Sequence, residues 1–264
     1  MPPKKRLDQL LVERGLVGSR SRAQALIMAG DVLVGDVPAT KAGELLPSDA
    51  PLRLRRPDHP YVSRGGLKLA HALDHFGVDP SGMVCLDIGA STGGFTDCLL
   101  RRGAVKVWAI DVGSNQLDYR LRADPRVVSR EGVNARDPGI TALVGEPIDL
   151  IVSDVSFISL TLAIPPSLPL LRPGGRALLL VKPQFEAGRE AVGKGGYVAD
   201  EGVRQGAVGK VVAFFSALGL IPLGVEESPV TGAASGNVEY LALFARPGNE
   251  ETAKKNLDTE PATP

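Results

Sequence analysis

The chain has 264 residues, with 30 Lys or Arg against 30 Asp or Glu, so its formal net charge is zero. This length fits one large domain with a small one, and no run approaches the 18 apolar residues of a membrane-spanning helix. Charges interrupt the apolar stretch after the basic start MPPKKRLDQLLVERG, so we expect no signal peptide and a cytoplasmic protein without a membrane partner.

Residues 1–56 predict a small, slightly basic α+β domain. RLDQLLVERGL spaces its leucines as a helix does, and Ser19 is placed to cap a second helix that ends near Gly30. DVLVGDVPAT alternates apolar and polar residues around a Gly-Asp turn, and APLRLRR adds a short strand. This helix-helix-hairpin order, with RLDQLL, SRSRAQALIMAGDVLVGD and ATKAG, resembles the S4 RNA-binding domain.

Basic residues of this segment are candidate contacts to phosphate. Arg20 and Arg22 stand at a helix start, where phosphate oxygens are also favoured. Such contacts position an RNA without reading its sequence. A solvated basic face is the alternative interpretation. The predicted RNA-binding residues are Arg6, Arg20, Arg22, Lys41 and Arg64.

The rest of the chain predicts a linker, a large α/β domain and a tail. RRPDHPYVSRGG has two prolines and little periodicity, which indicates a linker at 57–64. GLKLAHALDHFG predicts an amphipathic helix, and the apolar strands MVCLDIG, VKVWAID, RVVSR, PIDLIVSD and RALLLVK then alternate with helical segments before LIPLGVEES and NVEYLALFAR. Residues 65–246 therefore predict a doubly wound, mostly parallel sheet with ligands at the carboxyl ends of its strands. The polar residues 247–264 are expected to be disordered.

The stretch LDIGASTGGFTDCLL, residues 86–100, joins a strand to a helix through a glycine cluster. Ser91 stands where a G-x-G-x-x-G loop has its second glycine, which disfavours a dinucleotide. Asp87 precedes the glycines, and a carboxylate suits a cationic ligand such as S-adenosylmethionine. Asp111 ends the next strand, where it can accept hydrogen bonds from ribose hydroxyls, and Asn134 is placed to touch the adenine.

Together these residues resemble the cofactor loop of class I methyltransferases, which implies a Rossmann-like fold. The predicted S-adenosylmethionine-binding residues are Asp87, Gly89, Ser91, Thr92, Gly93, Gly94, Phe95, Asp111 and Asn134. GREAVGKG nearly matches a phosphate-binding P-loop, but Gly195 replaces the hydroxyl that holds Mg²⁺, so an NTPase is disfavoured. The cysteines have no metal-ligand spacing and the histidines form no set with them, so no metal site is predicted.

Residues at the strand ends indicate which atom is methylated. Both cysteines lie outside strand-end loops, which argues against base C5 methylation through a cysteine nucleophile. SDVSF lacks the Asn/Asp-Pro-Pro-aromatic motif that is common in methylation of exocyclic amines. Four charged residues are predicted to converge near the methyl group: Lys68, Asp154, Lys182 and Glu239. Two lysines with two carboxylates suit an alcohol, which must lose its proton during attack.

The Lys-Asp-Lys-Glu order resembles the tetrad of FtsJ/RrmJ-type ribose 2′-O-methyltransferases. Together with the S4-like domain, the motifs YVSRGGLKL, SDVSFISL, VKPQFE and GNVEY resemble the TlyA family, which includes proteins called haemolysin A. The resemblance implies 2′-O-methylation of cytidine in ribosomal RNA of the large subunit and in some members also the small one, with ribosomal RNA or subunits as partners. It also implies Lys182 as the base, Asp154 as central to catalysis, and Lys68 and Glu239 as positioning residues. Two alternatives stay open: a non-catalytic RNA-binding or ribosome-assembly factor, and a membrane-active haemolysin.

Overall fold

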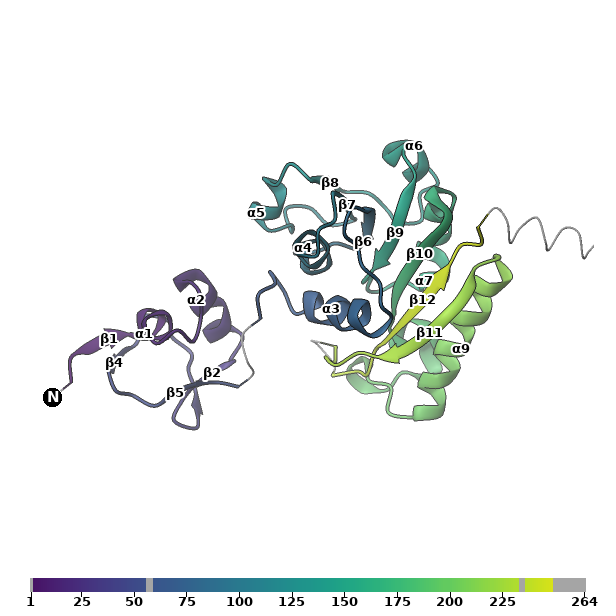
Figure 1. The fold of residues 1–264 in the computed structure, drawn as a ribbon. Helices are drawn as coiled ribbons and strands as arrows, with labels where there is room; N and C mark the ends of the chain where they lie inside the picture. Colours follow the sequence, from purple (N-terminus) through teal and green to yellow (C-terminus); the bar gives the residue numbers. More distant parts are fainter. Residues whose placement is uncertain (1, 56–58, 233–235, 249–264) are drawn as a thin grey trace, which may run out of the picture. The chain divides into compact units, whose positions relative to one another are not determined.

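A computed structural model describes residues 2–55, 59–232 and 236–248. The chain divides into an N-terminal unit, residues 1–60, and a C-terminal unit, residues 61–264 (Figure 1). The start of the predicted linker, residues 57–58, and residues 249–264 of the predicted tail lie outside the described residues. Among the residues that are described, no helix has the length and apolar character needed to cross a membrane.

The N-terminal unit is an α+β module around one small apolar core. Strand β2 lies between β3 and β5 in an antiparallel sheet, and β1 pairs with β4. Leu7 and Leu11 of the first helix meet Ala23 and Ile27 of the second in the core. The elements are β1 (Lys4–Arg6), α1 (Leu7–Glu13), α2 (Arg20–Met28), β2 (Val32–Val34), β3 (Val37–Pro38), β4 (Leu45–Pro47) and β5 (Leu52–Leu54).

Local signals in the sequence set the boundaries of α2. The Ser19 side chain accepts a hydrogen bond from the Arg22 backbone N–H at 3.2 Å, which satisfies one free donor at the helix start. Past the other end, Gly30 adopts a φ of +73°, a left-handed conformation that glycine reaches without strain. The predicted cap and the helix-helix-hairpin order are therefore confirmed.

The C-terminal unit is built on a seven-stranded sheet of order β11-β12-β10-β9-β6-β7-β8. Strands β10, β9, β6, β7 and β8 are parallel, and β12 runs antiparallel to both neighbours. This is the predicted doubly wound, mostly parallel sheet. Its strands are β6 (Val84–Ile88), β7 (Lys106–Asp111), β8 (Val127–Glu131), β9 (Ile148–Ser153), β10 (Leu171–Val181), β11 (Ile221–Glu227) and β12 (Tyr240–Ala245).

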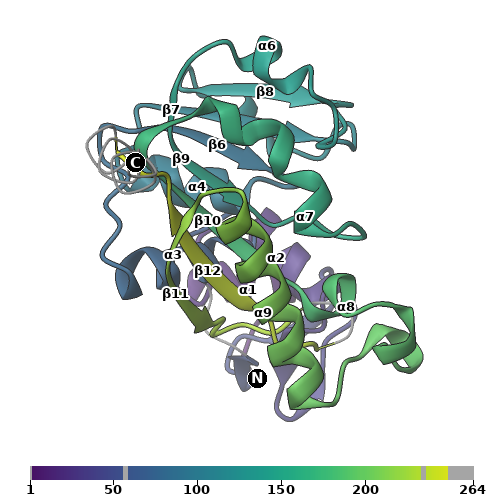
Figure 2. The same ribbon diagram turned by 90° about the vertical axis from the view of Figure 1, so that its right-hand side faces the viewer.

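Helices cover both faces of this sheet, and each face has its own apolar core. Because successive strand residues point to opposite faces, Cys85 of β6 packs with α3 and α4, whereas Leu86 and Ile88 pack toward α6, α7 and α9. Figure 2 shows α9 lying along the sheet over β10 and β12. The helices are α3 (Gly65–His75), α4 (Gly94–Arg101), α5 (Tyr119–Arg122), α6 (Ile140–Val144), α7 (Leu160–Ala163), α8 (Pro183–Glu186) and α9 (Glu201–Ala217), with short 3₁₀ turns at Pro165–Leu170, Arg189–Ala191 and Lys194–Gly196.

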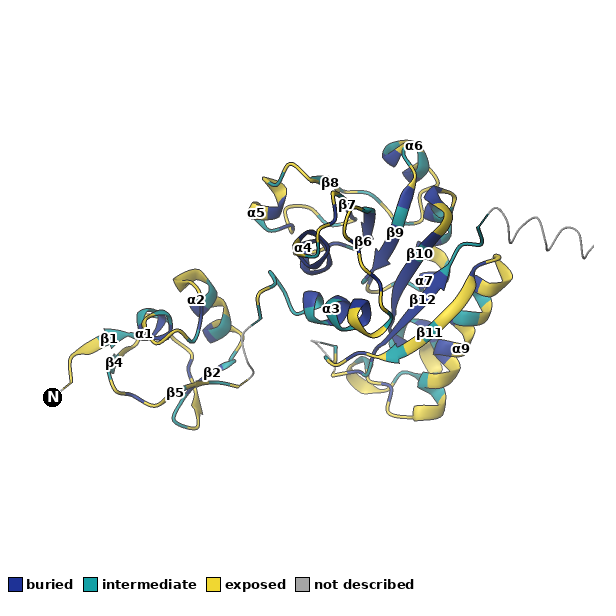
Figure 3. Ribbon diagram, viewed as in Figure 1, coloured by how far each residue is buried: buried dark blue, intermediate teal, exposed yellow. Residues whose placement is uncertain are grey.

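Burial and strand order together locate the candidate site. The central strands are buried along their length, whereas the edge strand β11 is largely exposed (Figure 3). Strands β6 and β9 are neighbours at the point where the strand order reverses, with Ile88 opposite Ser153. Ligands bind in the crevice at such a point, outside the carboxyl ends of the strands. The loops after β6 and β9 therefore carry the candidate site.

Candidate active site

The loop after β6 requires glycine at two positions, each time because of both backbone conformation and lack of space. Gly89 has a φ of +82°, and a Cβ there would lie 2.9 Å from Val155 Cγ1 of the loop after β9. Gly93 has a φ of +97°, and its Cβ would lie 2.3 Å from Leu121 Cδ1. Any larger residue at either place meets both backbone strain and a steric clash. The loop is thereby held close to the neighbouring strand ends.

Asp111, at the end of β7, fixes the same loop from the other side. Its Oδ2 accepts the Ser91 backbone N–H at 2.7 Å, and its Oδ1 accepts the Gly113 N–H at 2.7 Å. Each carboxylate oxygen can accept a further hydrogen bond. Asp111 is therefore oriented by the backbone and keeps acceptor capacity for a ligand, and its contact with a ribose hydroxyl stays a prediction.

Asp87 lies beneath the loop and is completely buried. Thr96 Oγ1 donates to its Oδ2 at 2.7 Å, while its Oδ1 is buried without a hydrogen-bond partner. Burial raises the pKa of the Asp87 carboxyl to about 7, and the nearby Asp154 carboxylate also raises it. Asp87 does not line either of the two cavities described next. Asp87 is therefore part of the support beneath the loop rather than of the cavity walls.

A groove of about 1240 Å³ runs along the carboxyl edge of the sheet. Its volume is above the range of typical small-molecule pockets, so it has room for a nucleoside cofactor and for part of a second ligand. Of the predicted cofactor residues, four line this groove: Gly89, Ser91, Asp111 and Asn134. Gly188, Arg189 and Val192 of the GREAVGKG segment line it from the opposite side.

A smaller cavity of about 150 Å³ adjoins the groove. Thr92, Gly94 and Phe95 line it, together with Ser63 and Lys182. Four residues line both spaces, which makes them the junction: Gly89, Ser91, Asp154 and Ser156. Among the predicted loop residues, only Gly93 and Asp87 line neither space.

Lys182 reaches this junction from the end of β10. Its Nζ forms an ion pair with Asp154 Oδ1 at 2.6 Å and donates a hydrogen bond to Ser156 Oγ at 2.7 Å. Lys182 is 7% exposed, so little water competes for its ammonium group. The pairing places one lysine and one carboxylate where the cofactor-sized groove meets the smaller cavity.

Lys68 and Glu239 form a second buried pair. Lys68 Nζ of α3 donates to Glu239 Oε2 at 2.5 Å, although the two residues are 171 positions apart. They are 8% and 2% exposed, and neither lines the two cavities. The four predicted charged residues are thus arranged as two ion pairs, one at the junction and one buried behind it in the protein.

Sequence reasoning missed several residues that line these spaces. Ser156 contacts Lys182, and only its place two residues after Asp154 in SDVSF hinted at a role. Phe157 is 91% exposed and has a φ of +64°, which a non-glycine residue rarely adopts. Its ring centroid lies 5.3 Å from that of Phe185, and both line the groove. An apolar, aromatic wall suits a planar ring such as a nucleobase.

Neither cysteine is placed to act as a nucleophile. Cys85 lies within β6 and Cys98 within α4, and both are buried free thiols. Burial raises the thiol pKa to about 12 for Cys85 and to about 11 for Cys98. Because the thiolate is the reactive form, this agrees with the expectation that the chain does not use a cysteine nucleophile.

Two of the predicted RNA-binding residues of the N-terminal unit, Arg6 and Arg20, contact the buried carboxylate of Asp8. Arg6 donates twice to Asp8, at 3.0 Å each, and Arg20 donates once at 3.1 Å. These arginines hold the pKa of the Asp8 carboxyl well below its usual range. Their side chains remain 41% and 51% exposed, so they stabilise the fold and still face solvent.

The other three predicted RNA contacts differ in their surroundings. The guanidinium of Arg22 lies 2.9 Å from His59 Nε2. Lys41 is exposed. Arg64 belongs to the C-terminal unit, where it immediately precedes α3. The five residues thus do not form a single set within the N-terminal unit.

Known proteins resemble this chain over nearly its whole length. Residues 61–246 match the family model of FtsJ-like methyltransferases, and residues 5–50 match that of the S4 domain. TlyA of Mycobacterium tuberculosis, a 16S/23S rRNA (cytidine-2′-O)-methyltransferase, is 42% identical over 98% of this chain and 96% of its own. The presumed rRNA methyltransferase YqxC of Bacillus subtilis is 45% identical over 97% of this chain and 91% of its own. The solved structure of a presumed hemolysin from Streptococcus thermophilus has a TM-score of 0.71 at 39% identity, covering 98% of this chain and all of that one.

Proposed function

The chain belongs to the FtsJ-like methyltransferase family, in the TlyA group that carries an S4 domain, and on this premise we propose that it methylates a ribose 2′-hydroxyl of ribosomal RNA with S-adenosylmethionine. The observation that carries the proposal is the ion pair of the buried Lys182 with Asp154, at the junction of a cofactor-sized groove with a smaller cavity. Cytidine is the proposed nucleoside, because the printed name of the Mycobacterium tuberculosis relative specifies it.

The groove supplies the groups that such a cofactor needs. Asp111 would accept hydrogen bonds from the ribose hydroxyls, and Asn134 would contact the adenine from the loop after β8. The strained backbone of Ser91, with a φ of +49°, directs the exposed loop toward the methionine part. The buried Asp87 lines neither cavity and would support, from beneath, the loop that holds the methionine part. When bound, S-adenosylmethionine supplies an electrophilic methyl group on a positively charged sulfur.

The proposed reaction needs a base for the 2′-hydroxyl. In our proposal Lys182 first releases its ammonium proton to solvent. Its neutral amine then accepts the hydroxyl proton as the oxygen attacks the methyl carbon and the bond from that carbon to sulfur breaks. Asp154 and Ser156 hold the lysine Nζ in place and stabilise the ammonium that forms. Holding the oxygen near attack distance, within the smaller cavity, supplies much of the rate acceleration. Lys68 and Glu239 act as positioning residues through their buried pair.

Substitution of Lys182 by Ala tests the assignment. We expect Lys182→Ala to lower 2′-O-methylation of cytidine in ribosomal RNA by about 10²-fold or more, in the range of a lost general base, while calorimetry shows unchanged S-adenosylmethionine binding. Lys106→Ala is the matched control, because Lys106 also forms an ion pair, with Glu146 at 2.5 Å, but at the amino end of β7. Full methylation by the Lys182→Ala protein would contradict the catalytic role and favour a non-catalytic RNA-binding factor.

A further inference from the structure

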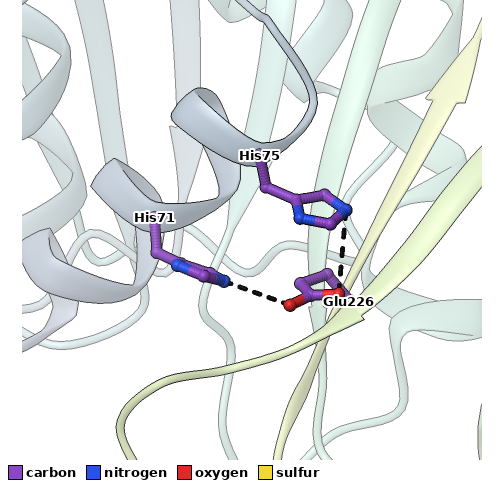
Figure 4. Close-up of side chains that lie close together, drawn as sticks. All are labelled: His71, His75 and Glu226. Carbon is purple, nitrogen blue, oxygen red and sulfur yellow. Dashed lines mark hydrogen bonds and ion pairs between the residues drawn. The ribbon is translucent and has the colours of Figure 1, made fainter.

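Two imidazoles and one carboxylate meet on the surface between α3 and β11, within the C-terminal unit (Figure 4). His71 and His75 are four residues apart on α3, so they lie on the same face of the helix. His71 Nε2 lies 3.4 Å from Glu226 Oε1, and His75 Nε2 lies 3.7 Å from Glu226 Oε2. One donor atom from each residue lies within 4.8 Å of the other two. The side chains are 32% to 43% exposed, so an ion can reach them from solvent.

Apolar packing brings α3 and β11, which carry the three side chains, close to one another. A Cβ on Gly224 would lie 2.9 Å from Phe76 Cε1, so the end of α3 approaches β11 as closely as glycine allows. The His75 ring packs edge-on against the Phe76 ring, with centroids 4.7 Å apart. The distance between helix and strand is therefore set by apolar contacts, and the donors are preorganised before an ion binds.

The donor set favours one class of metal ion. Two imidazole nitrogens and a carboxylate suit Zn²⁺, Co²⁺, Ni²⁺ or Cu²⁺, whereas Mg²⁺ and Ca²⁺ prefer oxygen donors alone. In a tetrahedral zinc site with bonds of about 2.0–2.1 Å, neighbouring donor atoms are about 3.3 Å apart. The contacts of 3.4 and 3.7 Å are near this spacing, although they involve the two different carboxylate oxygens of Glu226, and one donor atom from each residue lies within 4.8 Å of the other two. We propose that His71, His75 and Glu226 bind one divalent cation of the zinc class, with water in the remaining position.

The position of the site suggests what a bound ion does. His71 lies one helical turn after Lys68 on α3. Strand β11 pairs with β12, which begins at Tyr240, the residue after Glu239. The Ser228 N–H, just past β11, also donates to the Glu239 carbonyl oxygen at 2.8 Å. An ion held by α3 and β11 therefore braces the two elements that support the Lys68–Glu239 pair. It stabilises the C-terminal unit and takes no part in the reaction, so the proposal does not depend on the proposed function.

Metal titration of the untagged full-length chain tests the proposal, since a polyhistidine tag would bind the same ions. We expect calorimetry to give one Zn²⁺ per chain at this site, and Co²⁺ to give the visible absorption of a low-symmetry nitrogen and oxygen site. The His71→Ala/His75→Ala double variant is expected to bind Zn²⁺ at least tenfold more weakly. His59→Ala is the matched control, because His59 is the third histidine of the chain and lies in the N-terminal unit; its variant should bind as the unchanged protein does.

Thermal unfolding gives a second measurement. A ligand that binds only the folded state raises the unfolding temperature, so Zn²⁺ should stabilise the unchanged protein and EDTA should reverse the effect. The double variant, first shown by circular dichroism to be folded, should gain no stability from Zn²⁺. Absence of saturable Zn²⁺ binding by the unchanged protein, or equal binding by the double variant, would overturn the proposal.

Discussion

At the scale of single residues, buried charges decide how this protein depends on pH. Lys68, Lys182 and Glu239 are buried, and each has an oppositely charged partner within 2.6 Å. Asp87 differs from them, because the donors described for it are neutral groups of Thr96, the hydroxyl and the backbone N–H. A buried carboxylate without a cation favours its protonated form. Protonation and folding are therefore coupled at Asp87.

The stability of the C-terminal unit should fall as pH rises through the weakly acidic range. The folded protein keeps the Asp87 proton up to a pKa of about 7, whereas an unfolded chain loses it near the ordinary aspartate pKa of 3.8. Between these values the native state binds more protons, so raising the pH favours unfolding, by about 4 kcal/mol at most. The asparagine of an Asp87→Asn variant cannot titrate, so this variant should not lose stability in this way.

Denaturant unfolding at pH 5 and pH 8 measures the effect. Trp108 is the single tryptophan of the chain and lies in β7, so its fluorescence follows the C-terminal unit alone. The Asp87→Asn protein should gain stability relative to the unchanged protein as the pH rises from 5 to 8. Parallel pH dependence of the two proteins would show that Asp87 is already ionised in the folded state.

At the scale of elements, the start of α4 depends on a close approach to α3. A Cβ on Gly94 would lie 2.2 Å from Ser63 Oγ, 3.0 Å from the Gly66 backbone N and 3.2 Å from Gly65 Cα. Backbone atoms cannot rotate away as a side chain does, so the two helix starts must separate. This contact sets one wall of the small cavity, since Ser63, Gly65 and Gly94 all line it.

Gly94→Ala should therefore destabilise the C-terminal unit by about 1–3 kcal/mol, the usual cost of overpacking. The matched control is Gly206→Ala in the middle of α9, where a Cβ meets nothing within 4 Å. Because alanine favours a helix over glycine, that change should stabilise the unit by about 0.5–1 kcal/mol. Trp108 fluorescence during denaturant unfolding measures both. Equal effects of the two substitutions would contradict the close-packing argument.

The sequence predicts the elements well and their side-chain contacts poorly, for a physical reason. Strand and helix periods are local, so α3 and the seven strands of the sheet were all expected from short segments. The pairing of Lys68 with Glu239 depends on where α3 packs against a strand that lies 171 residues further on. The meeting of His71 and His75 with Glu226 depends on the same packing, and no local pattern contains it.

At the scale of the whole molecule, the two units divide the proposed task. The C-terminal unit has two apolar cores of its own and contains the groove, both ion pairs and the glycine loop. The N-terminal unit has a separate core and carries exposed basic residues such as Lys41 and the partly exposed Arg20. Phosphate contacts of this kind supply affinity rather than sequence selection. Chemistry and RNA affinity should therefore be separable.

Removal of residues 1–60 makes this separation measurable. The shortened chain keeps both cores of the C-terminal unit, so we expect it to fold. Trp108 should then show the fluorescence of a buried tryptophan, and the chain should bind S-adenosylmethionine as tightly as the full chain does.

Binding of the shortened chain to ribosomal RNA should weaken. Its affinity for the RNA should also fall less steeply with salt, because fewer phosphate contacts release counterions. Methylation at low RNA concentration should drop, and a higher RNA concentration should recover part of it. Equal RNA affinity and equal salt dependence of the two chains would mean that the N-terminal unit does not hold the RNA.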